Sequence, residues 1–380
     1  MLTQIAGLNV KEFMEHDWHV KPRLFRNAFP DFEPICDIDT IFELVADEDI
    51  ESRLIKKVEE EWELEHGPFE TLPDLNQRNW TVLVQGLDLV LPEAHDLLQQ
   101  FRFIPDARLD DIMLSLASDG GGVGPHYDSY DVFLIQMHGR RRWRIGPLKN
   151  KNLVADAPVK LLSDFEPEQE LVLEPGDMLY LPPNYGHDGQ AVGVCTTLSV
   201  GFRALNKGEL LSHLLRELAD RVEENKELAN ELFSDPRRGL QTDPSEIPND
   251  LIGFAQNLYR EFVPNPADLQ RCLGVLLSEP KPNVYFENNT EDMEPEDIIH
   301  ILSEQGIALA MGTRILFKNS RCFANGEVMD FKDQASLQWM KKLVNSSQLE
   351  PDEANKALKH DEFKFYVVGF AKAGWLNTVY

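Results

Sequence analysis

The sequence has few cysteines, few basic residues and no long apolar run, and each shortage excludes a class of protein. Its 380 residues include four scattered cysteines (Cys36, Cys195, Cys272 and Cys322) without a CxxC pair. That spacing excludes a cysteine zinc module and favours a reducing compartment. No stretch approaches the roughly 18 to 20 apolar residues that cross a bilayer. The start, MLTQIAGLNVKEFMEHDW, reaches charged residues before an apolar run forms, so we expect no signal peptide, no membrane association and a cytoplasmic protein.

Positive charge is also scarce, with 37 Lys and Arg against 65 Asp and Glu and a net charge of −28. A surface this negative repels phosphate, which argues against a nucleic-acid binder held by its overall field. The same negative surface would attract a strongly basic partner protein. Apolar residues make up 42% of the chain, enough for a buried core. At roughly 150 residues per domain, the length predicts two or three domains.

The first part of the chain is predicted to be mainly β. Between about Leu24 and Arg203, short apolar runs are broken by Gly, Pro and Asp, a pattern typical of strands and turns. We expect strands within Trp80–Leu87, Ile112–Ser118, Asp131–His138, Arg141–Gly146, Glu170–Pro183 and Cys195–Arg203. Because the connections are turns and not long helices, an antiparallel sandwich or barrel is favoured over a parallel sheet.

A helical segment is predicted to follow. Five apolar residues recur at spacings of three and four and form one stripe: Leu211, Leu214, Leu215, Leu218 and Val222. A second helical run is expected from Leu251 to Val263. Packing on the barrel or on a second copy of the chain would bury the stripe, and we predict a homodimer.

The last hundred residues are predicted to form a small α/β module. The pattern indicates a helix over Pro295–Glu304, a strand over Thr313–Lys318, a hairpin turn at Asn325-Gly326 and a helix over Ala335–Asn345. Helices beside a small hairpin resemble a winged helix. Residues 281–380 hold 11 Lys or Arg and 15 Asp or Glu, which is a poor charge for a DNA reader. We therefore interpret this module as a docking or scaffold domain without direct DNA binding.

The strongest chemical signal is the segment GGGVGPHYDSYDVF. Its His126 and Asp128 are two positions apart, so on an extended segment their side chains point to the same side. A third ligand is available from His187 in LEPGDMLYLPPNYGHDG. Two His and one carboxylate leave three octahedral positions open, which is the arrangement of non-haem Fe(II) oxygenases. Zinc more often takes a closed tetrahedron, or three ligands and one water.

These segments resemble the JmjC-type cupin oxygenases, which depend on Fe(II) and 2-oxoglutarate. Within that family they are most similar to the bacterial ribosomal oxygenases that hydroxylate an arginine of large-subunit ribosomal protein sixteen. The matching stretches span most of the first 205 residues: EHGPFE (Glu65–Glu70), GGGVGPHYDSYDVFLIQ (Gly120–Gln136), GRRRWR (Gly139–Arg144), LEPGDMLYLPP (Leu173–Pro183) and SVGFRA (Ser199–Ala204).

The resemblance implies a mainly β fold with helices in three parts. Residues 1–206 would form a double-stranded β-helix, the cupin or JmjC barrel, that carries catalysis. Residues 207–277 would form a helical dimerisation segment, and residues 278–380 a winged-helix-like domain.

An anchor for the distal carboxylate of 2-oxoglutarate is expected among the arginines of GRRRWR, since planar guanidinium forks bind carboxylates through two bonds. Arg141 shares the strand parity of the apolar Trp143 and Ile145, so it should point into the barrel. Arg140, Arg142 and Arg144 should point outward. Arg141 also follows His126 by fifteen positions, where the resemblance places the basic anchor of the family.

Three further residues are weaker candidates. The hydroxyls of Ser115 and Thr197 would complete the keto-acid site, although the family favours Asn where Thr197 stands. Asp119, at the start of the glycine-rich turn, would pair with a substrate guanidinium; the simpler interpretation is an ordinary turn residue.

The resemblance thus implies an enzyme in which His126, Asp128 and His187 hold Fe(II), with 2-oxoglutarate and dioxygen as co-substrates. The substrate would be an arginine, hydroxylated at its β-carbon (3-hydroxylation), of a basic ribosomal protein, and complementary charge would speed that encounter. Two alternatives stay open: hydroxylation of another target, such as a histidine of another ribosomal protein, or a non-enzymatic regulator that joins a cupin to a DNA-binding winged helix. A regulator would need a basic recognition face, which the tail lacks.

Overall fold

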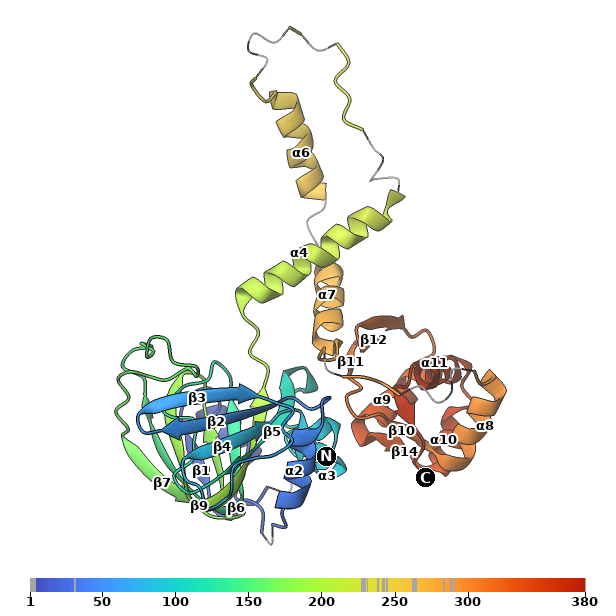
Figure 1. Cartoon of the computed structure of the whole chain (residues 1–380). Coiled ribbons are helices and arrows are strands. Elements are labelled where there is room, and N and C mark those ends of the chain that lie inside the picture. Colours follow the sequence, from blue (N-terminus) through green and yellow to red (C-terminus); the bar gives the residue numbers. More distant parts are fainter. Residues whose placement is uncertain are drawn as a thin grey trace.

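The computed structural model describes residues 5–379 except residues 31, 227–229, 231, 238, 241–242, 244, 262–264, 283, 288–289 and 291. In Figure 1 the N-terminal part curls into a barrel, a group of helices projects away from it, and a C-terminal α/β domain lies beside it. The four cysteines are free, as their scattered spacing predicts.

The barrel is one antiparallel sheet of nine strands in the order β1-β8-β6-β9-β5-β4-β2-β3, with β7 paired to β6. Antiparallel pairing across residues 109–202 confirms the prediction made from the turn-rich texture. The strands are β1 (Arg23–Phe25), β2 (Ser52–Val58), β3 (Glu61–His66), β4 (Trp80–Val84), β5 (Leu109–Ala117), β6 (Val132–Pro147), β7 (Gln169–Leu173), β8 (Met178–Leu181) and β9 (Tyr185–Phe202).

One feature of the barrel differs from the predicted strand boundaries. The expected strands Asp131–His138 and Arg141–Gly146 are a single strand, β6, whose pairing with β9 shifts register on either side of His138. Gly139 lies at this irregularity with φ +63°, and a Cβ there would lie 2.2 Å from the Val194 carbonyl oxygen. A glycine is therefore required where the strand bends, and sequence reading interpreted that bend as a break.

Both faces of the central strands are buried. Phe133 and Ile135 of β6 belong to the main core, whereas Val132 and Leu134 belong to a second cluster with Trp143. This double burial explains why the first four residues of β6, Val132 to Ile135, read as a continuous apolar run and not as an alternation.

Short helices cover the barrel and close its main core. Phe13, from α1, packs edge-on against Tyr180 with ring centroids 4.8 Å apart and contacts Phe133 at 5.5 Å. These elements are α1 (Val10–His16), α2 (Ile38–Ala46), α3 (Pro92–Gln99) and the 3₁₀ turns η1 (Leu87–Leu89) and η2 (Asp106–Arg108).

The helical segment contains α4 (Lys207–Glu224), α6 (Asn249–Glu261) and α7 (Pro266–Ser278). Asn206 caps α4 by accepting a hydrogen bond from the Glu209 N–H at 2.8 Å. The predicted run Leu251–Val263 corresponds to α6, although Val263 itself lies outside the described residues. Figure 1 shows α4 leaving the barrel and α7 returning to the C-terminal domain. Among the described residues, no helix has the length and apolar character that a membrane span requires.

In its described residues, the C-terminal domain has two small three-stranded sheets among four helices. The elements are α8 (Pro295–Gln305), β10 (Ile307–Leu309), β11 (Ile315–Lys318), β12 (Arg321–Ala324), β13 (Glu327–Asp330), α9 (Gln334–Ser346), β14 (Gln348–Leu349), α10 (Pro351–Ala357), α11 (Asp361–Lys372) and β15 (Leu376–Asn377). The predicted hairpin turn joins β12 to β13, with φ +47° at Asn325 and +87° at Gly326. Positive φ at both positions is what a type I′ turn requires.

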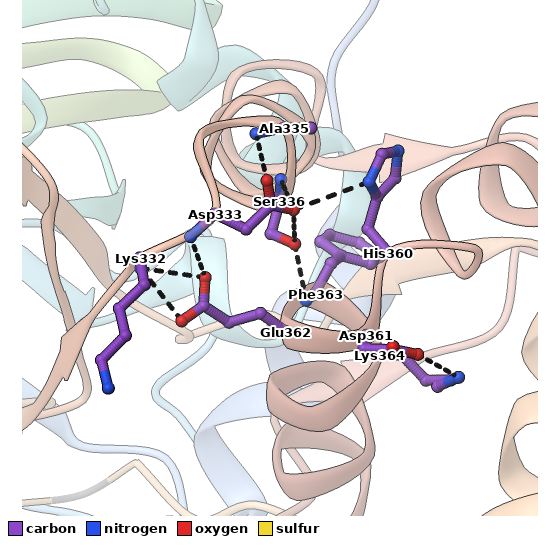
Figure 2. A network of polar contacts seen from close by, with 9 residues as sticks. All are labelled: Lys332, Asp333, Ala335, Ser336, His360, Asp361, Glu362, Phe363 and Lys364. Atoms are coloured by element: carbon purple, nitrogen blue, oxygen red, sulfur yellow. Dashed lines mark hydrogen bonds and ion pairs between the residues drawn. The ribbon is translucent and has the colours of Figure 1, made fainter.

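A polar network fixes the start of α9 in this domain (Figure 2). The Asp333 carboxylate caps α9 by accepting from the N–H groups of Ala335 and Ser336 at 3.1 and 2.9 Å. Glu362, from α11, accepts from the N–H groups of Lys332 and Asp333. The two helices are thus joined through backbone donors that would otherwise lack partners.

Arginine side chains join the barrel to the C-terminal domain. Arg102 donates to the carbonyl oxygens of Val344 and Asn345 at 3.2 and 3.1 Å. In the other direction, Arg314 donates to the carbonyl oxygens of Leu109 and Asp110 at 3.3 and 2.9 Å. The C-terminal domain therefore contacts the start of β5, which also forms part of the cavity described next.

Candidate active site and metal centre

The predicted ligands converge at one end of the barrel. One ligand atom from each of His126, Asp128 and His187 lies within 4.8 Å of the others, and no second cluster of this kind occurs in the part of the chain that the structure describes. The two histidines exchange backbone hydrogen bonds of 2.9 Å in both directions. Gly122 permits this close pairing of loop and strand, because a Cβ there would lie 2.3 Å from the Gly189 carbonyl oxygen.

Backbone carbonyls orient both imidazole rings. His126 Nδ1 lies 2.9 Å from the Gly124 oxygen, and His187 Nδ1 lies 3.0 Å from the Tyr185 oxygen. Because a carbonyl only accepts, each Nδ1 carries the hydrogen and each Nε2 is left with a free lone pair. Burial, the main cause, lowers the pKa of His187 to about 4. The ring is therefore neutral at physiological pH, as a metal ligand must be.

This donor set fits Fe(II). Two imidazole nitrogens and one carboxylate form the facial arrangement of non-haem iron sites, with positions left for other ligands. Asp128 Oδ2 lies 3.5 Å from His187 Nε2, so the carboxylate and the imidazole face the same small volume.

A cavity of about 610 Å³ opens in front of these three residues, a size typical of small-molecule sites. Alternate residues of several strands form its walls, as the pleat of the sheet dictates. The wall residues include Arg53 and Ile55 of β2, Leu83 of β4 and Gln85 just after it, Asp111, Met113 and Ser115 of β5, Val132, Leu134, Arg141 and Trp143 of β6, and Ser199 and Gly201 of β9.

Arg141 is the basic residue buried in this cavity. Its side chain points inward with a residue exposure of 5%, whereas Arg140 and Arg142 are exposed, as strand parity predicts. Arg141 Nη1 donates to the Ser115 hydroxyl at 3.0 Å, while Nε and Nη2 have no partner among the described residues. A buried guanidinium with free donors is costly unless an anion completes it, and a carboxylate is the matching group.

The structure places the two weaker co-substrate candidates differently. Ser115 lies on the cavity wall beside Arg141. Thr197 lies opposite Ser115 in the β5–β9 pair, but its hydroxyl contacts Gln136 Oε1 at 3.2 Å and it is absent from the cavity wall. The geometry therefore supports a keto-acid contact for Ser115 and not for Thr197.

Asp119 is also not brought to the cavity. Its carboxylate pairs with Arg78 at 2.9 Å and accepts the Gly193 N–H at 2.9 Å. It thus stabilises the turn, which is the simpler of the two interpretations that the sequence allowed.

Besides the metal-ligand candidate Asp128, the acidic residues that line the cavity are Asp110 and Asp111. The β5–β9 pairing shifts register between Leu109 and Ile112, so a bulge brings two consecutive carboxylates to one side. Sequence reading missed this pair, since strict alternation would place only one of them inside. Lys281, from the segment after α7, contacts both. The only local signal is the doubled Asp at the start of a strand.

Comparisons with known proteins agree with this geometry. Family models match the chain in two places: the JmjC domain over residues 96–210 and the ROXA-like winged helix over residues 256–377. The chain is 30% identical to the ribosomal protein uL16 3-hydroxylase of Escherichia coli K12 over 97% of each sequence.

Solved structures extend the likeness to the whole fold. The X-ray structure of E. coli ycfD superposes with a TM-score of 0.85 at 30% identity, covering 99% of this chain and 100% of that one. The structure of the E. coli ribosomal oxygenase YcfD with cobalt and 2-oxoglutarate gives a TM-score of 0.81 at 29% identity over 99% of both chains. The predicted cupin barrel with a winged-helix tail is confirmed.

Proposed function

Because this chain belongs to the JmjC-domain ribosomal oxygenases, we propose that it is an Fe(II)- and 2-oxoglutarate-dependent hydroxylase of ribosomal protein uL16. The residue type we propose as its target is an arginine. The observation that carries the proposal is the coexistence, in one cavity, of a two-histidine, one-carboxylate cluster and a buried arginine with free donors.

Each of these groups has a separate task. His126, Asp128 and His187 would hold Fe(II), which together with 2-oxoglutarate and dioxygen supplies the oxidising power to convert a C–H bond into C–OH. Arg141 would bind the distal carboxylate of 2-oxoglutarate through the donors that have no protein partner. Ser115 holds the guanidinium in place by accepting from Nη1.

The cavity entrance suits a cationic side chain. Asp110 and Asp111 bring two carboxylates to the wall, and Tyr127 and Tyr130 line the same entrance. Aromatic rings and carboxylates together bind a guanidinium by stacking and by charge-assisted hydrogen bonds. The net charge of −28 favours encounter with a basic ribosomal protein. We also propose a cytoplasmic location, where ribosomal proteins are synthesised.

We further propose that the chain is a homodimer. Residues 207–277 would form the dimerisation segment between the catalytic domain of residues 1–206 and the winged-helix-like domain of residues 278–380. None of the residues of α4 is buried, and Leu211 and Leu215 of the apolar stripe are 54% and 57% exposed. A second copy of this face would bury both leucines. A DNA-binding role is not proposed, since residues 281–380 carry more acidic than basic groups.

Mass spectrometry of uL16 from cells with and without the gene tests the function. We expect one arginine-containing peptide to lose a mass increment of one oxygen atom when the gene is absent. Fragmentation then assigns the modified residue. An unchanged uL16, or an increment located on a histidine of another ribosomal protein, would contradict the proposal.

A further inference from the structure

Lys281 lies at the entrance of the active-site cavity, although it belongs to the segment that leads into the C-terminal domain. Its Nζ is 3.0 Å from Asp110 Oδ1 and 3.0 Å from Asp111 Oδ2, and its side chain is 28% exposed. Pro280 and Pro282 flank it and restrict the backbone on both sides. The chain thus holds one of its own cations on the two carboxylates that face the cavity.

Two arginines also lie near the acidic pair. Arg203 Nε is 3.7 Å from Asp110 Oδ1, beyond normal hydrogen-bond length. Arg314 donates to the Asp110 carbonyl oxygen at 2.9 Å and acts to lower the pKa of Asp111. Asp111 has a side-chain exposure of 16%, and burial raises its pKa. A partly buried carboxylate of this kind gains most from a cation that makes two directed bonds.

A second groove, about 400 Å³ in volume, adjoins the cavity at this point. Asp110, Tyr130 and Lys281 line both spaces, and the groove also contains Glu209 and Glu279. The flexible four-carbon stem of lysine would reach this groove if the ammonium left Asp111, and two glutamates are available to receive it. Lys281 thus lines, together with two glutamates, a groove into which its ammonium would move when it leaves the cavity.

We propose that Lys281 occupies the cation subsite of the substrate as an internal competitor, so that only a side chain that binds the acidic pair more strongly than an ammonium opens the site. This inference rests on the proposed arginine hydroxylation and names how the same site selects its substrate. An incoming lysine would exchange one ammonium for another and gain little. An incoming arginine is less strongly hydrated and makes bidentate bonds to carboxylates, so it displaces Lys281 with a net gain.

The test measures the affinity of the full-length protein for two labelled peptides by fluorescence anisotropy, with Mn(II) and 2-oxoglutarate present and oxygen absent. One peptide is the uL16 segment that carries the target arginine, and its twin has lysine in that place. Lys281→Met keeps the stem and removes the charge, and Lys281→Arg supplies a stronger internal competitor. We expect Lys281→Met to bind the arginine peptide roughly threefold to fivefold more tightly than wild type, and Lys281→Arg to bind it more weakly. The affinity for the lysine peptide should rise by the same factor, because the cost of displacing Lys281 is common to both peptides.

Lys160 provides a matched control. It lines the same cavity, is exposed and lies on a different segment from the acidic pair. Lys160→Met changes the charge of the cavity by the same amount, so an equal gain in this variant would reveal a general electrostatic effect and overturn the proposal.

Two further results would also overturn it. Weaker binding by Lys281→Met together with unchanged binding by Lys281→Arg would make Lys281 a positioning residue for the acidic pair. Unchanged binding of both peptides by Lys281→Met would show that Lys281 does not compete for the subsite. A wild-type enzyme that fails to hydroxylate the arginine peptide in air would instead contradict the proposed function, so the two failures are distinguishable.

Discussion

Arg141 donates a hydrogen bond to the Ser115 hydroxyl at 3.0 Å and keeps two other guanidinium nitrogens without a partner among the described residues. Ser115 cannot neutralise the charge, so the buried cation is complete only when an anion enters the cavity. This pair therefore links the fold of β5 and β6 to the choice of an anionic co-substrate.

Arg141→Ala should weaken 2-oxoglutarate binding by about one to two decades, because it removes charge-assisted bonds worth about 1.5 to 3 kcal/mol. Metal binding should persist, since no ligand is changed. Isothermal titration of 2-oxoglutarate into the Mn(II)-loaded variant measures the loss. Arg142→Ala is the matched control, because Arg142 is exposed and pairs with Glu170 at 3.5 Å. Equal losses in both variants would mean that the effect is not specific to the inward guanidinium.

Asp128→Ala should abolish 2-oxoglutarate turnover, because the carboxylate serves the metal and not the core. The thermal midpoint of the metal-free protein should move by less than about 2 °C, and chelation of metal from the wild type should give the same loss of turnover. Succinate production measures the activity. Turnover at the native rate in the variant would show that the three ligands are wrongly assigned.

Asp111→Asn should raise the KM for the uL16 substrate by about tenfold or more, because a partly buried carboxylate loses its charge towards the substrate cation. Asp119→Asn should leave this KM nearly unchanged, since Asp119 is occupied by Arg78 and the Gly193 N–H. Steady-state kinetics of both variants shows which of the two carboxylates binds the substrate cation. A larger rise in KM for Asp119→Asn than for Asp111→Asn would instead indicate that Asp119 binds the substrate guanidinium, as the sequence suggested.

Leu211→Asp combined with Leu215→Asp should convert the proposed dimer into a monomer, because two exposed apolar side chains of α4 would carry charge. Light scattering coupled to size-exclusion chromatography at micromolar concentration measures the mass. Ser212→Asp, which adds charge to the same helix without removing a leucine, should remain dimeric. A wild-type protein with the mass of a monomer at micromolar concentration would contradict the proposed dimer.

Asp88→Asn should stabilise the protein at pH 8, by about half as much at pH 5, and change its stability little near pH 3. Burial raises the pKa of Asp88 from 3.8 to about 6, while its Oδ1 accepts the Ile112 N–H at 2.8 Å. A raised folded-state pKa means that this group favours folding at low pH, and that its contribution of up to about 3 kcal/mol is lost as the pH rises from about 4 through 6. Asparagine keeps the hydrogen bond and cannot ionise. The thermal midpoints of wild type and Asp88→Asn, measured from about pH 3 to pH 8, test this direction. A stabilisation by Asp88→Asn that grows towards low pH would contradict it.

Local spacing was enough to predict that two of the three metal ligands point to the same side and which arginine points inward. His126 and Asp128 are separated by one residue, and Arg141 shares the parity of Trp143 and Ile145. The side-chain period of a strand is two residues whatever lies around it, so these relationships survive any arrangement of the barrel. His187 in the later segment LEPGDMLYLPPNYGHDG offered the third ligand, and the resemblance of the motifs supplied the cofactor.

The contacts that span the chain were decided only by the tertiary structure. The bulge that turns both Asp110 and Asp111 into the cavity depends on how β5 pairs with β9, and Lys281 reaches this pair from a segment far later in the chain. From the sequence, Asp119 looked free to bind substrate, but folding brings Arg78 to its carboxylate. Thr197 likewise looked free to bind 2-oxoglutarate, but Gln136 on a neighbouring strand accepts from its hydroxyl. Sequence periodicity reports the direction of a side chain along its own element. The partner that satisfies its charge or hydroxyl is set by strand register and domain packing, which only the folded chain determines.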